Sequence, residues 1–253
     1  MKILSWNVNG IRSVSNKNEL LKFLKEKADF YCFQELKSQE KDIPNLLYNF
    51  KNYQFYSNCG LRKGHSGVGI LTNQKPIKIE TKIGFKPFDS EGRFLLLEFK
   101  KYILINLYII NGGRKKENLN YKLKFYDYFI KKYLPKLKHK NIIMVGDFNI
   151  AHSEIDLARP KENKNNIMFT LEERKQIDNL LKSNFIDTFR YLHIKGNNYT
   201  WWPYFYNARS RNLGWRIDYC FISNNLISKL EKAFILSKQM GSDHCPTGIS
   251  INL

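Results

Sequence analysis

Carboxylates and side-chain amides recur at the ends of apolar, strand-like segments of this 253-residue sequence. Asp147 and Asn149 follow one such run and stand two residues apart, so both side chains share one face of an extended segment. The set in chain order is Asn7, Asn9, Glu35, Asp147, Asn149, Asp218, Asp243 and His244. Each residue alone is commonly a turn, cap or solvated residue. Their recurrence in one chain favours a shared site.

These residue types suit the hydrolysis of a phosphodiester. The reaction needs an activated water in line with the leaving oxygen and positive charge on the phosphoryl oxygens. Glu35 offers the hard oxygen ligand that Mg²⁺ prefers, and Mn²⁺ can substitute for Mg²⁺. Asp147 can orient or deprotonate the water. His244 can stabilise charge on the phosphate when a carboxylate orients its ring. We therefore expect a metal-dependent phosphodiesterase.

The composition is compatible with a nucleic-acid substrate. The formal net charge is +19, from 42 Lys and Arg against 23 Asp and Glu, and such a surface attracts polyanions. A Lys-rich and Asn-rich bias that merely raises the pI is the alternative. Aromatic residues make up 15% of the chain, which suits stacking on bases or a large core equally well. The four cysteines form no CxxC pair, so buried thiols are expected rather than zinc ligands or disulfides.

The sequence carries no targeting or membrane signal that we can identify. Met1 and Lys2 lead directly into an apolar run, which leaves no room for a signal peptide. The longest apolar stretch, Tyr102 to Ile110, is too short to span a membrane and is interrupted by Asn106. We expect a soluble, cytoplasmic protein that does not act on membranes.

The elements that must position these residues alternate between short apolar runs and amphipathic segments. The expected strands are Lys2–Trp6, Phe30–Phe33, Gly67–Thr72, Phe94–Phe99, Tyr102–Tyr108, Asn141–Val145, Tyr199–Trp202, Ile217–Ile222 and Thr247–Ile251. The expected helices are Asn18–Lys27, Asn118–Leu134 and Leu171–Ser183, and a capping box of Thr170 and Glu173 begins the last one.

Two of these strands echo each other. The segments Lys2–Asn7 and Ile142–Asn149 are both apolar and both end in Asn or Asp. A duplicated half with two sheets packed face to face would bring both strand ends to one edge. Coincidence between two buried strands is the alternative interpretation.

Longer motifs around the same residues resemble the exonuclease III family of apurinic/apyrimidinic (AP) endonucleases. The motifs are Trp6-Asn-Val-Asn-Gly-Ile-Arg12, Gln34-Glu-Leu-Lys37, Gly146-Asp-Phe-Asn-Ile-Ala-His152, Gly214-Trp-Arg-Ile-Asp-Tyr219 and Ser242-Asp-His-Cys-Pro246. Further blocks in the same order are Ser66-Gly-Val-Gly69, Asp89-Ser-Glu-Gly-Arg93 and Tyr108-Ile-Ile-Asn-Gly112. The resemblance extends from Lys2 to Pro246.

The resemblance implies an α/β fold, a four-layer αββα sandwich of two packed mixed sheets flanked by helices, in a single domain over residues 1–253. It implies that Glu35 is the principal metal ligand, that Asn9 and Asp243 are secondary or water-mediated ligands, and that Asn7 helps to hold the metal region. The implied catalytic residues are Tyr108 on the phosphate, Asp147 and Asn149 on the water, and His244 oriented by Asp218.

Two positions depart from the family pattern. Ile110 stands where the family often has Pro, which can loosen the loop that carries Tyr108 and Asn111. Asn9 stands where some relatives have Asp, and because an amide is a weaker ligand, a second metal position is in doubt.

Substrate recognition is also implied by the resemblance. Trp201, Trp215 and Ile217 would line a pocket for an extruded abasic sugar, although both tryptophans would equally suit a core. Basic and polar loop residues would contact the flanking phosphates, although isolated basic loops are more often plain surface. These residues are Arg62, Lys63, His65, Asn111, Arg114 and Arg216.

The expected activity is therefore cleavage of duplex DNA 5′ to abasic sites, leaving a 3′-OH, with 3′-5′ exonuclease and 3′-phosphatase activity as further possibilities. The expected partner is duplex DNA with abasic sites or blocked 3′ ends, bound by a monomer. One alternative is a related phosphoesterase acting on RNA, lipid headgroups or inositol phosphates. Another is a nucleic-acid-binding protein that has lost catalysis, which the intact set of acids and His244 disfavours.

Overall fold

The computed structural model describes residues 1–137 and 141–253, and these residues form two six-stranded sheets. The first sheet has the order β11-β12-β1-β2-β4-β3 and consists of β1 (Lys2–Asn7), β2 (Phe30–Gln34), β3 (Gln54–Asn58), β4 (Val68–Thr72), β11 (Leu230–Ile235) and β12 (Thr247–Ile251). The second has the order β5-β6-β7-β8-β10-β9 and consists of β5 (Lys78–Glu80), β6 (Phe94–Glu98), β7 (Ile103–Tyr108), β8 (Ile142–Asp147), β9 (Phe185–Asp187) and β10 (Asp218–Ser223).

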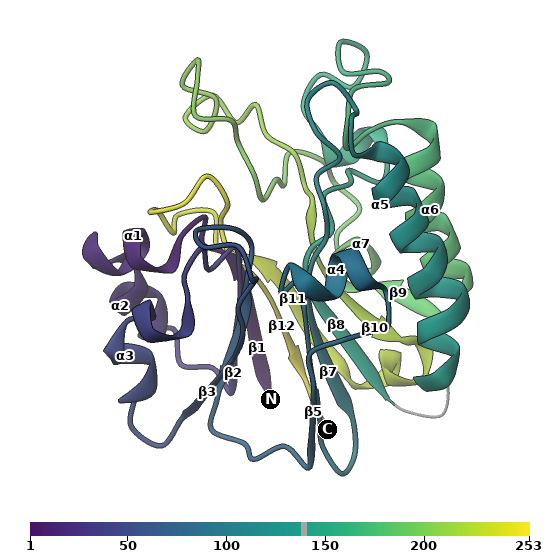
Figure 1. Cartoon of the computed structure of the whole chain (residues 1–253). Coiled ribbons are helices and arrows are strands. Elements are labelled where there is room, and N and C mark those ends of the chain that lie inside the picture. The colour runs from purple at the N-terminus through teal and green to yellow at the C-terminus, as the bar shows by residue number, and fades with distance from the viewer. Residues whose placement is uncertain (138–140) are drawn as a thin grey trace.

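Helices cover the two outer faces of this pair of sheets (Figure 1). The first sheet is flanked by α1 (Ile11–Asn16), α2 (Glu19–Leu24) and α3 (Asn45–Tyr48). The second is flanked by α4 (Lys86–Ser90), α5 (Leu119–Tyr128) and α6 (Leu171–Lys182), whereas α7 (Thr188–Leu192) packs against β10 and β11. The expected four-layer αββα sandwich is confirmed.

Strand periodicity explains why the sheets have two buried faces. Along β8, Ile143 and Val145 belong to the core between the sheets, whereas Ile142 and Met144 pack in the core beneath α5 and α6. Successive side chains of a strand point to opposite faces, so a strand buried on both faces is a continuous apolar run. This explains why the central strands were predictable.

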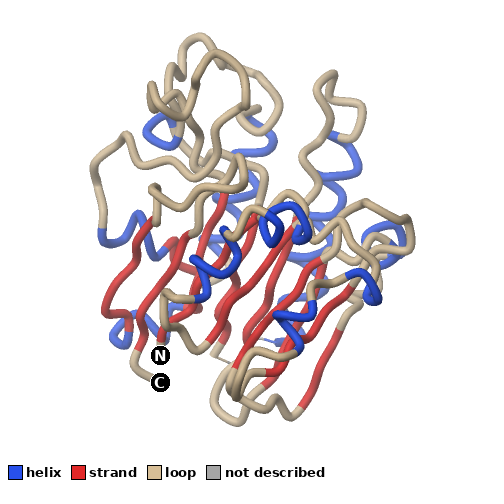
Figure 2. Tube along the Cα trace, turned by 90° about the vertical axis from the view of Figure 1, so that its left-hand side faces the viewer, coloured by secondary structure: helices blue, strands red, loops and turns tan. Residues whose placement is uncertain are grey.

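The topology brings the polar strand ends together. β1 runs parallel to β2, and β7 runs parallel to β8, so each pair ends at the same edge of its sheet. β10 is antiparallel to β8 and begins at Asp218, whose register partner is Asp147. The longest loops gather beyond this end of the strands, and both chain termini lie at the other end (Figure 2). The echo between β1 and β8 therefore reflects equivalent strands of two facing sheets.

Four strands were not predicted, and all four lie at sheet edges. These are β3, β5, β9 and β11. An edge strand has one neighbour and commonly carries charged and polar side chains, so it lacks the apolar run of a central strand. β5 and β9 are also only three residues long.

The strand expected at Tyr199–Trp202 is wrong. The structure has only isolated bridges there, from Trp201 to Trp215 and to His244. Its aromatic residues favour β-structure but pack against neighbouring loop segments instead of joining a sheet. For so short a segment, tertiary packing outweighs the intrinsic β-propensity of the residues.

The three expected helices are present with altered ends. The helix expected at Asn18–Lys27 is shorter, and α5 continues through a π-helical turn (Phe129–Tyr133) into a 3₁₀ turn that contains Pro135. The capping box of Thr170 and Glu173 is confirmed at α6. All four cysteines lie in the described part of the chain and are free thiols, as expected. Within the described residues, no helix has the length and apolarity needed to cross a membrane.

Candidate active site

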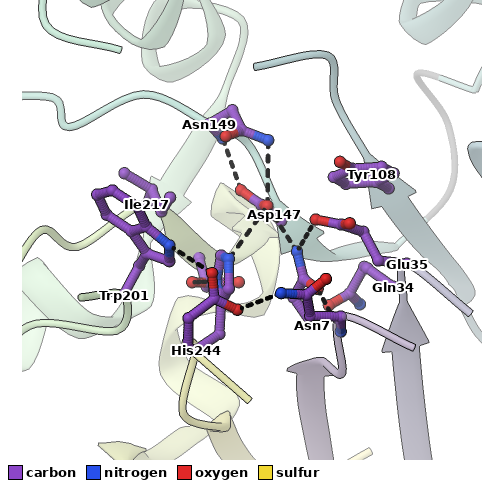
Figure 3. A network of polar contacts seen from close by, with 12 residues as sticks. Asn7, Gln34, Glu35, Tyr108, Asp147, Asn149, Trp201, Ile217 and His244 are labelled. Atoms are coloured by element: carbon purple, nitrogen blue, oxygen red, sulfur yellow. Dashed lines mark hydrogen bonds and ion pairs between the residues drawn. The ribbon is translucent and has the colours of Figure 1, made fainter. Parts of the chain in front are cut away.

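Asn7 joins the two sheets at the polar edge. It is the last residue of β1, and its Nδ2 donates to Oε1 of Glu35 and to Oδ2 of Asp147, both at 2.9 Å (Figure 3). Its own Oδ1 accepts the backbone N–H of Asn9 at 3.0 Å. Both ends of the buried amide are therefore hydrogen-bonded, and its nitrogen holds the two carboxylates together.

Asn149 holds Asp147 from the other side. Its backbone N–H donates to Oδ1 of Asp147 at 2.8 Å, and its Nδ2 donates to Oδ2 at 3.1 Å. Burial, followed by the nearby Asp218 carboxylate, raises the pKa of Asp147 to about 8. A carboxyl group with a pKa near neutrality is suited to proton transfer.

His244 faces Asp147 and is oriented by Asp218. Its Nδ1 lies 2.9 Å from Oδ2 of Asp218, and its Nε2 lies 3.9 Å from Oδ2 of Asp147. Burial alone would lower the pKa of His244, but the Asp218 carboxylate raises it to about 10. The ring therefore carries positive charge at neutral pH, which suits contact with a phosphoryl oxygen.

Glu35, Asp147 and His244 form the one group in the described residues whose possible ligand atoms all lie within 4.8 Å of one another. A cationic imidazole has no lone pair for a metal, so the two carboxylates are the candidate ligands of this group. Burial opposes ionisation of Glu35, but the Lys37 ammonium, 2.7 Å from Oε2, and the Asn7 amide lower its pKa below the ordinary value. A carboxylate kept ionised beside a second carboxylate is the donor set that a hard divalent cation requires.

Asn9 and Asp243 lie together at the rim of this group. Asn9 Nδ2 donates to Oδ1 of Asp243 at 2.9 Å, and Trp201 Nε1 donates to Oδ2 of Asp243 at 3.0 Å. The Lys37 ammonium also contacts the Asn9 oxygen. Asp243 thus links the metal region to the aromatic wall of the site.

These groups open into a cavity of about 380 Å³. Trp201 and Ile217 form part of its wall, together with Tyr108, whose phenol pKa is raised well above its ordinary value by burial and by Glu35. The predicted residues that line the cavity are Asn9, Glu35, His65, Tyr108, Asn111, Asp147, Asn149, Trp201, Ile217, Asp243 and His244.

Four other residues predicted to contact DNA do not line the cavity. Arg62, Lys63 and Arg114 are exposed on loops. Trp215 is buried behind Trp201, with ring centroids 6.4 Å apart, and belongs to a small core rather than to the cavity lining.

The expectation that Arg216 contacts phosphate is wrong. Its side chain is 1% exposed, and its guanidinium binds Asp156 at 2.7 Å and Asp187 at 2.6 Å. Burial demands that such a charge be paired, so this arginine is structural. Arg209 is likewise occupied, because it donates to the backbone carbonyls of Ser242 and Ser237.

Sequence reasoning missed several residues of the site. Lys37 lies in the quoted Glu35 motif, and its two-residue spacing from Glu35 was an available signal. Arg93 lies 4.5 Å from the centroid of the Tyr108 ring, and its block had been recognised without assigning it a role. Met168 lines the cavity from a loop, and no sequence signal points to it.

Comparisons with known proteins agree with this geometry. Residues 4–244 match the model of the Endonuclease/Exonuclease/phosphatase family. An exodeoxyribonuclease of Bacillus subtilis is 39% identical over 256 residues, which span 100% of both chains. A DNA-(apurinic or apyrimidinic site) endonuclease of Dictyostelium discoideum is 40% identical over 100% of this chain and 71% of its own length.

Solved structures share the whole fold. An AP endonuclease from Archaeoglobus fulgidus superposes with a TM-score of 0.91 at 27% identity, covering 100% of both chains. A 3′-5′ exonuclease from Neisseria meningitidis has the same fold, with a TM-score of 0.91 at 24% identity. The chain therefore belongs to the Endonuclease/Exonuclease/phosphatase family, and within it is a DNA phosphodiesterase of the exonuclease III and AP endonuclease type.

Proposed function

We propose that the protein is a metal-dependent AP endonuclease of base excision repair, which cleaves the DNA phosphodiester 5′ to abasic sites and leaves a 3′-OH. The observation that carries this proposal is the convergence of Glu35, Asp147 and His244 in a cavity walled by Trp201 and Ile217. The Dictyostelium relative, named as an endonuclease of apurinic or apyrimidinic sites, supports the substrate class.

Glu35 would hold Mg²⁺, with Asp147 beside it and Asn9 and Asp243 at the rim. Mn²⁺ would take the same place, since both cations prefer oxygen ligands. The bound cation supplies charge neutralisation at the scissile phosphate. Asn7 Nδ2 donates to both Glu35 and Asp147 at 2.9 Å. These hydrogen bonds reduce the repulsion between the two carboxylates in the metal-free protein.

The other catalytic residues act on the attacking water and on the phosphoryl oxygens. Asp147, held by Asn149, orients the attacking water and accepts its proton. His244, kept cationic by Asp218, donates from Nε2 to a phosphoryl oxygen and stabilises the charge that develops there. The protonated phenol of Tyr108 donates to another phosphoryl oxygen.

Trp201 and Ile217 provide the selectivity in this proposal. An abasic nucleotide has no base to unstack or unpair, so its extrusion into a small pocket costs little. An apolar wall next to the phosphate site accepts the deoxyribose, whereas an intact nucleotide would have to place a base there. Arg62, Lys63, His65, Asn111 and Arg114 are proposed to hold the flanking DNA.

The decisive test is incision of a duplex that carries one tetrahydrofuran abasic analogue. We expect Mg²⁺-dependent cleavage on the 5′ side that stops with EDTA, and little internal cleavage of the undamaged duplex when the 3′ ends of both duplexes are blocked against exonuclease digestion. Equal cleavage of both duplexes would refute the abasic selectivity, and no cleavage of either would refute the nuclease assignment.

We also propose 3′-5′ exonuclease and 3′-phosphatase activity at the same site, because each reaction attacks a phosphate beside the same metal group. The exodeoxyribonuclease of Bacillus subtilis supports the first of these. A recessed 3′ end and a 3′-phosphate end, each tested with wild-type protein and Asp147→Asn, would measure them. Activity that survives the substitution would place the reaction at another site.

A single domain over residues 1–253 is supported by the core between the sheets, to which both sheets contribute. One cooperative unfolding transition is the expected result, and two separate transitions would contradict it. The four free thiols suit the reducing cytoplasm, where we propose that the protein acts as a monomer. Light scattering in solution would check the monomer.

A further inference from the structure

Lys122 of α5 is fully buried beneath the loops that follow β7 and β8 and does not line the cavity. Its ammonium donates to the backbone carbonyl of Asn149 at 2.5 Å and to Oε1 of Glu173 at 2.6 Å. A third acceptor, the carbonyl of Asn111, lies at 3.5 Å. The three donors of the ammonium thus meet three acceptors, and the side chains of Lys122 and Glu173 are both 0% exposed.

The two carbonyls belong to loops that carry catalytic residues. The loop after β8 carries Asn149, whose N–H and side chain hold Asp147, and the loop after β7 carries Asn111 at the cavity. Asn149 has φ of 52°, a left-handed conformation that a residue with a side chain adopts only when its surroundings hold it. Its N–H faces Asp147 while its carbonyl is held by Lys122.

Glu173 anchors this arrangement to α6. Its Oε2 accepts from the backbone N–H of Thr170 at 3.1 Å and from Oγ1 of Thr170 at 2.9 Å, which completes the capping box of the helix. Lys122 therefore connects the first turn of α6 to the peptide that fixes Asp147. α5 and α6 lie side by side on the outer face of the second sheet (Figure 1).

We propose that Lys122 is a positioning residue for phosphodiester cleavage, which fixes the Asn149 peptide from behind and thereby sets the orientation of Asp147. This inference rests on the proposed function. Any buried ammonium needs acceptors for its three donors, so the informative feature is which acceptors Lys122 has: two of the three are carbonyls of the loops that carry catalytic residues. If the Lys122–Glu173 ion pair served only stability, replacing it with neutral groups would leave the active site unchanged. Because Lys122 donates to the Asn149 carbonyl, losing the ammonium would free the peptide that holds Asp147.

A matched pair of variants isolates this contact. Glu173→Gln removes the carboxylate charge and keeps an oxygen for Thr170. Without that charge, burial lowers the pKa of Lys122 and favours its neutral amine, which accepts a hydrogen bond from the new amide N–H and still donates to the carbonyls of Asn149 and Asn111. The double variant Lys122→Met/Glu173→Gln removes the donors as well, without leaving an unpaired buried charge. Comparing the two therefore measures what the donors contribute, free of the cost of a lone buried carboxylate.

The readouts are the single-turnover cleavage rate of an abasic duplex in Mg²⁺ and the affinity for the uncleaved duplex in EDTA. We expect the double variant to cleave about 10- to 100-fold more slowly than Glu173→Gln, since small misplacements of catalytic groups have effects of this size. The affinity of the two variants for DNA is expected to be equal, because Lys122 does not line the cavity.

Leu180→Ala provides the stability control. Leu180 is a buried residue of α6 that does not line the cavity, so this variant should lower the thermal midpoint while its cleavage rate remains that of the wild type. Equal cleavage rates for Glu173→Gln and the double variant would overturn the positioning role. An equal loss of rate in Leu180→Ala would also overturn it, by attributing the loss to destabilisation. Inactive wild-type protein would instead refute the proposed function.

Discussion

The amide nitrogen of Asn7 lies 2.9 Å from Oδ2 of Asp147, and this hydrogen bond joins the end of β1 to the end of β8 across the two sheets. The same nitrogen donates to Glu35. A neutral donor shared by the buried Asp147 and the partly exposed Glu35 reduces the repulsion between the two carboxylates without adding charge that would compete with a cation. The active site is thus held together at the interface of the two halves of the fold.

Asn7→Ala should slow cleavage on the order of 100-fold, because Asp147 and Glu35 lose their common donor and reorient. The single-turnover cleavage rate of an abasic duplex measures this. Asn225→Ala, at an exposed asparagine in the 3₁₀ turn after β10, is the matched control and should cleave like the wild type. A wild-type rate in Asn7→Ala would show that the bridge does not matter for catalysis.

Asp218→Asn should change the pH dependence of cleavage as well as its rate. The Asp218 carboxylate raises the pKa of His244 to about 10, so the wild-type ring stays cationic through neutral pH and loses its proton only as pH rises towards that value. Without this carboxylate, burial favours the neutral ring, and the cation forms only at lower pH. The same substitution of the acid that orients the histidine of serine proteases costs about 10⁴-fold in rate, and a loss of up to that size is expected here.

A pH–rate profile of Asp218→Asn should therefore gain a loss of activity on the alkaline side, in the range where imidazole ordinarily titrates, because the neutral ring forms there. The wild-type profile should lack that alkaline step. The loss on the acidic side, where Asp147 becomes protonated and cannot accept a proton, is expected in both proteins. A variant profile of the same shape as the wild type would contradict the assignment of the charge to His244.

Glu35→Gln should weaken Mg²⁺ binding by at least about 10-fold, because the principal carboxylate ligand becomes a neutral amide. Isothermal titration calorimetry with MgCl₂ measures this without relying on activity. Glu40→Gln removes an exposed acid close by in the sequence and serves as the control. Equal affinity in Glu35→Gln and wild type would remove Glu35 from the metal site.

Much of this site was predictable because its chemistry is encoded in residue types at strand ends. Glu35 and Asp147 were identified from sequence because a carboxylate directly after an apolar strand is visible without a structure. Arg216 was misjudged because sequence alone does not reveal that Asp156, sixty positions earlier, neutralises it inside the core. Lys122 was unremarkable in sequence, because its partner Glu173 lies on another helix.

The strands of the fold likewise divide into those that the sequence predicts and those that it does not. The central strands β1, β2, β7 and β8 are apolar runs buried on two faces, and their positions were predicted. The edge strands have one neighbour and mixed polarity, so their pairing depends on the assembled sheet rather than on local sequence.

Trp201→Ala should slow the cleavage of an abasic duplex more than it slows the hydrolysis of a 3′-phosphate. Only the first reaction needs an abasic sugar to pack against Trp201 in the cavity. Trp201 also holds Asp243 through its Nε1, so Trp201→His, which keeps a ring donor, provides the comparison. The measurement is the ratio of the two rates for each variant. An unchanged ratio in Trp201→Ala would remove Trp201 from substrate selection.

Asp156→Asn tests whether the ion pairs of Asp156 with Arg216 and Arg190 stabilise the folded protein. Arg216 directly precedes Ile217 and Asp218, so this cluster anchors the segment that carries two residues of the site. The two arginines overcome the effect of burial and lower the pKa of Asp156 to about 2, below the value of about 3.9 for an unfolded aspartate. Its stabilising contribution is therefore fully present above pH ~4 and is lost as pH falls through the folded value near 2.

At neutral pH, Asp156→Asn should lower the free energy of unfolding by roughly 3 kcal/mol, because Arg216 keeps its charge in the core with one carboxylate fewer. Urea unfolding of both proteins between pH ~7 and ~2 measures this, and the difference should shrink towards the acid end, where the wild-type carboxylate also becomes neutral. Asp178→Asn, at a half-exposed acid of α6 paired with His152 at the surface, should change the free energy of unfolding by at most about 1 kcal/mol. A difference that stays constant with pH would mean that the ionised Asp156 carboxylate does not stabilise the cluster.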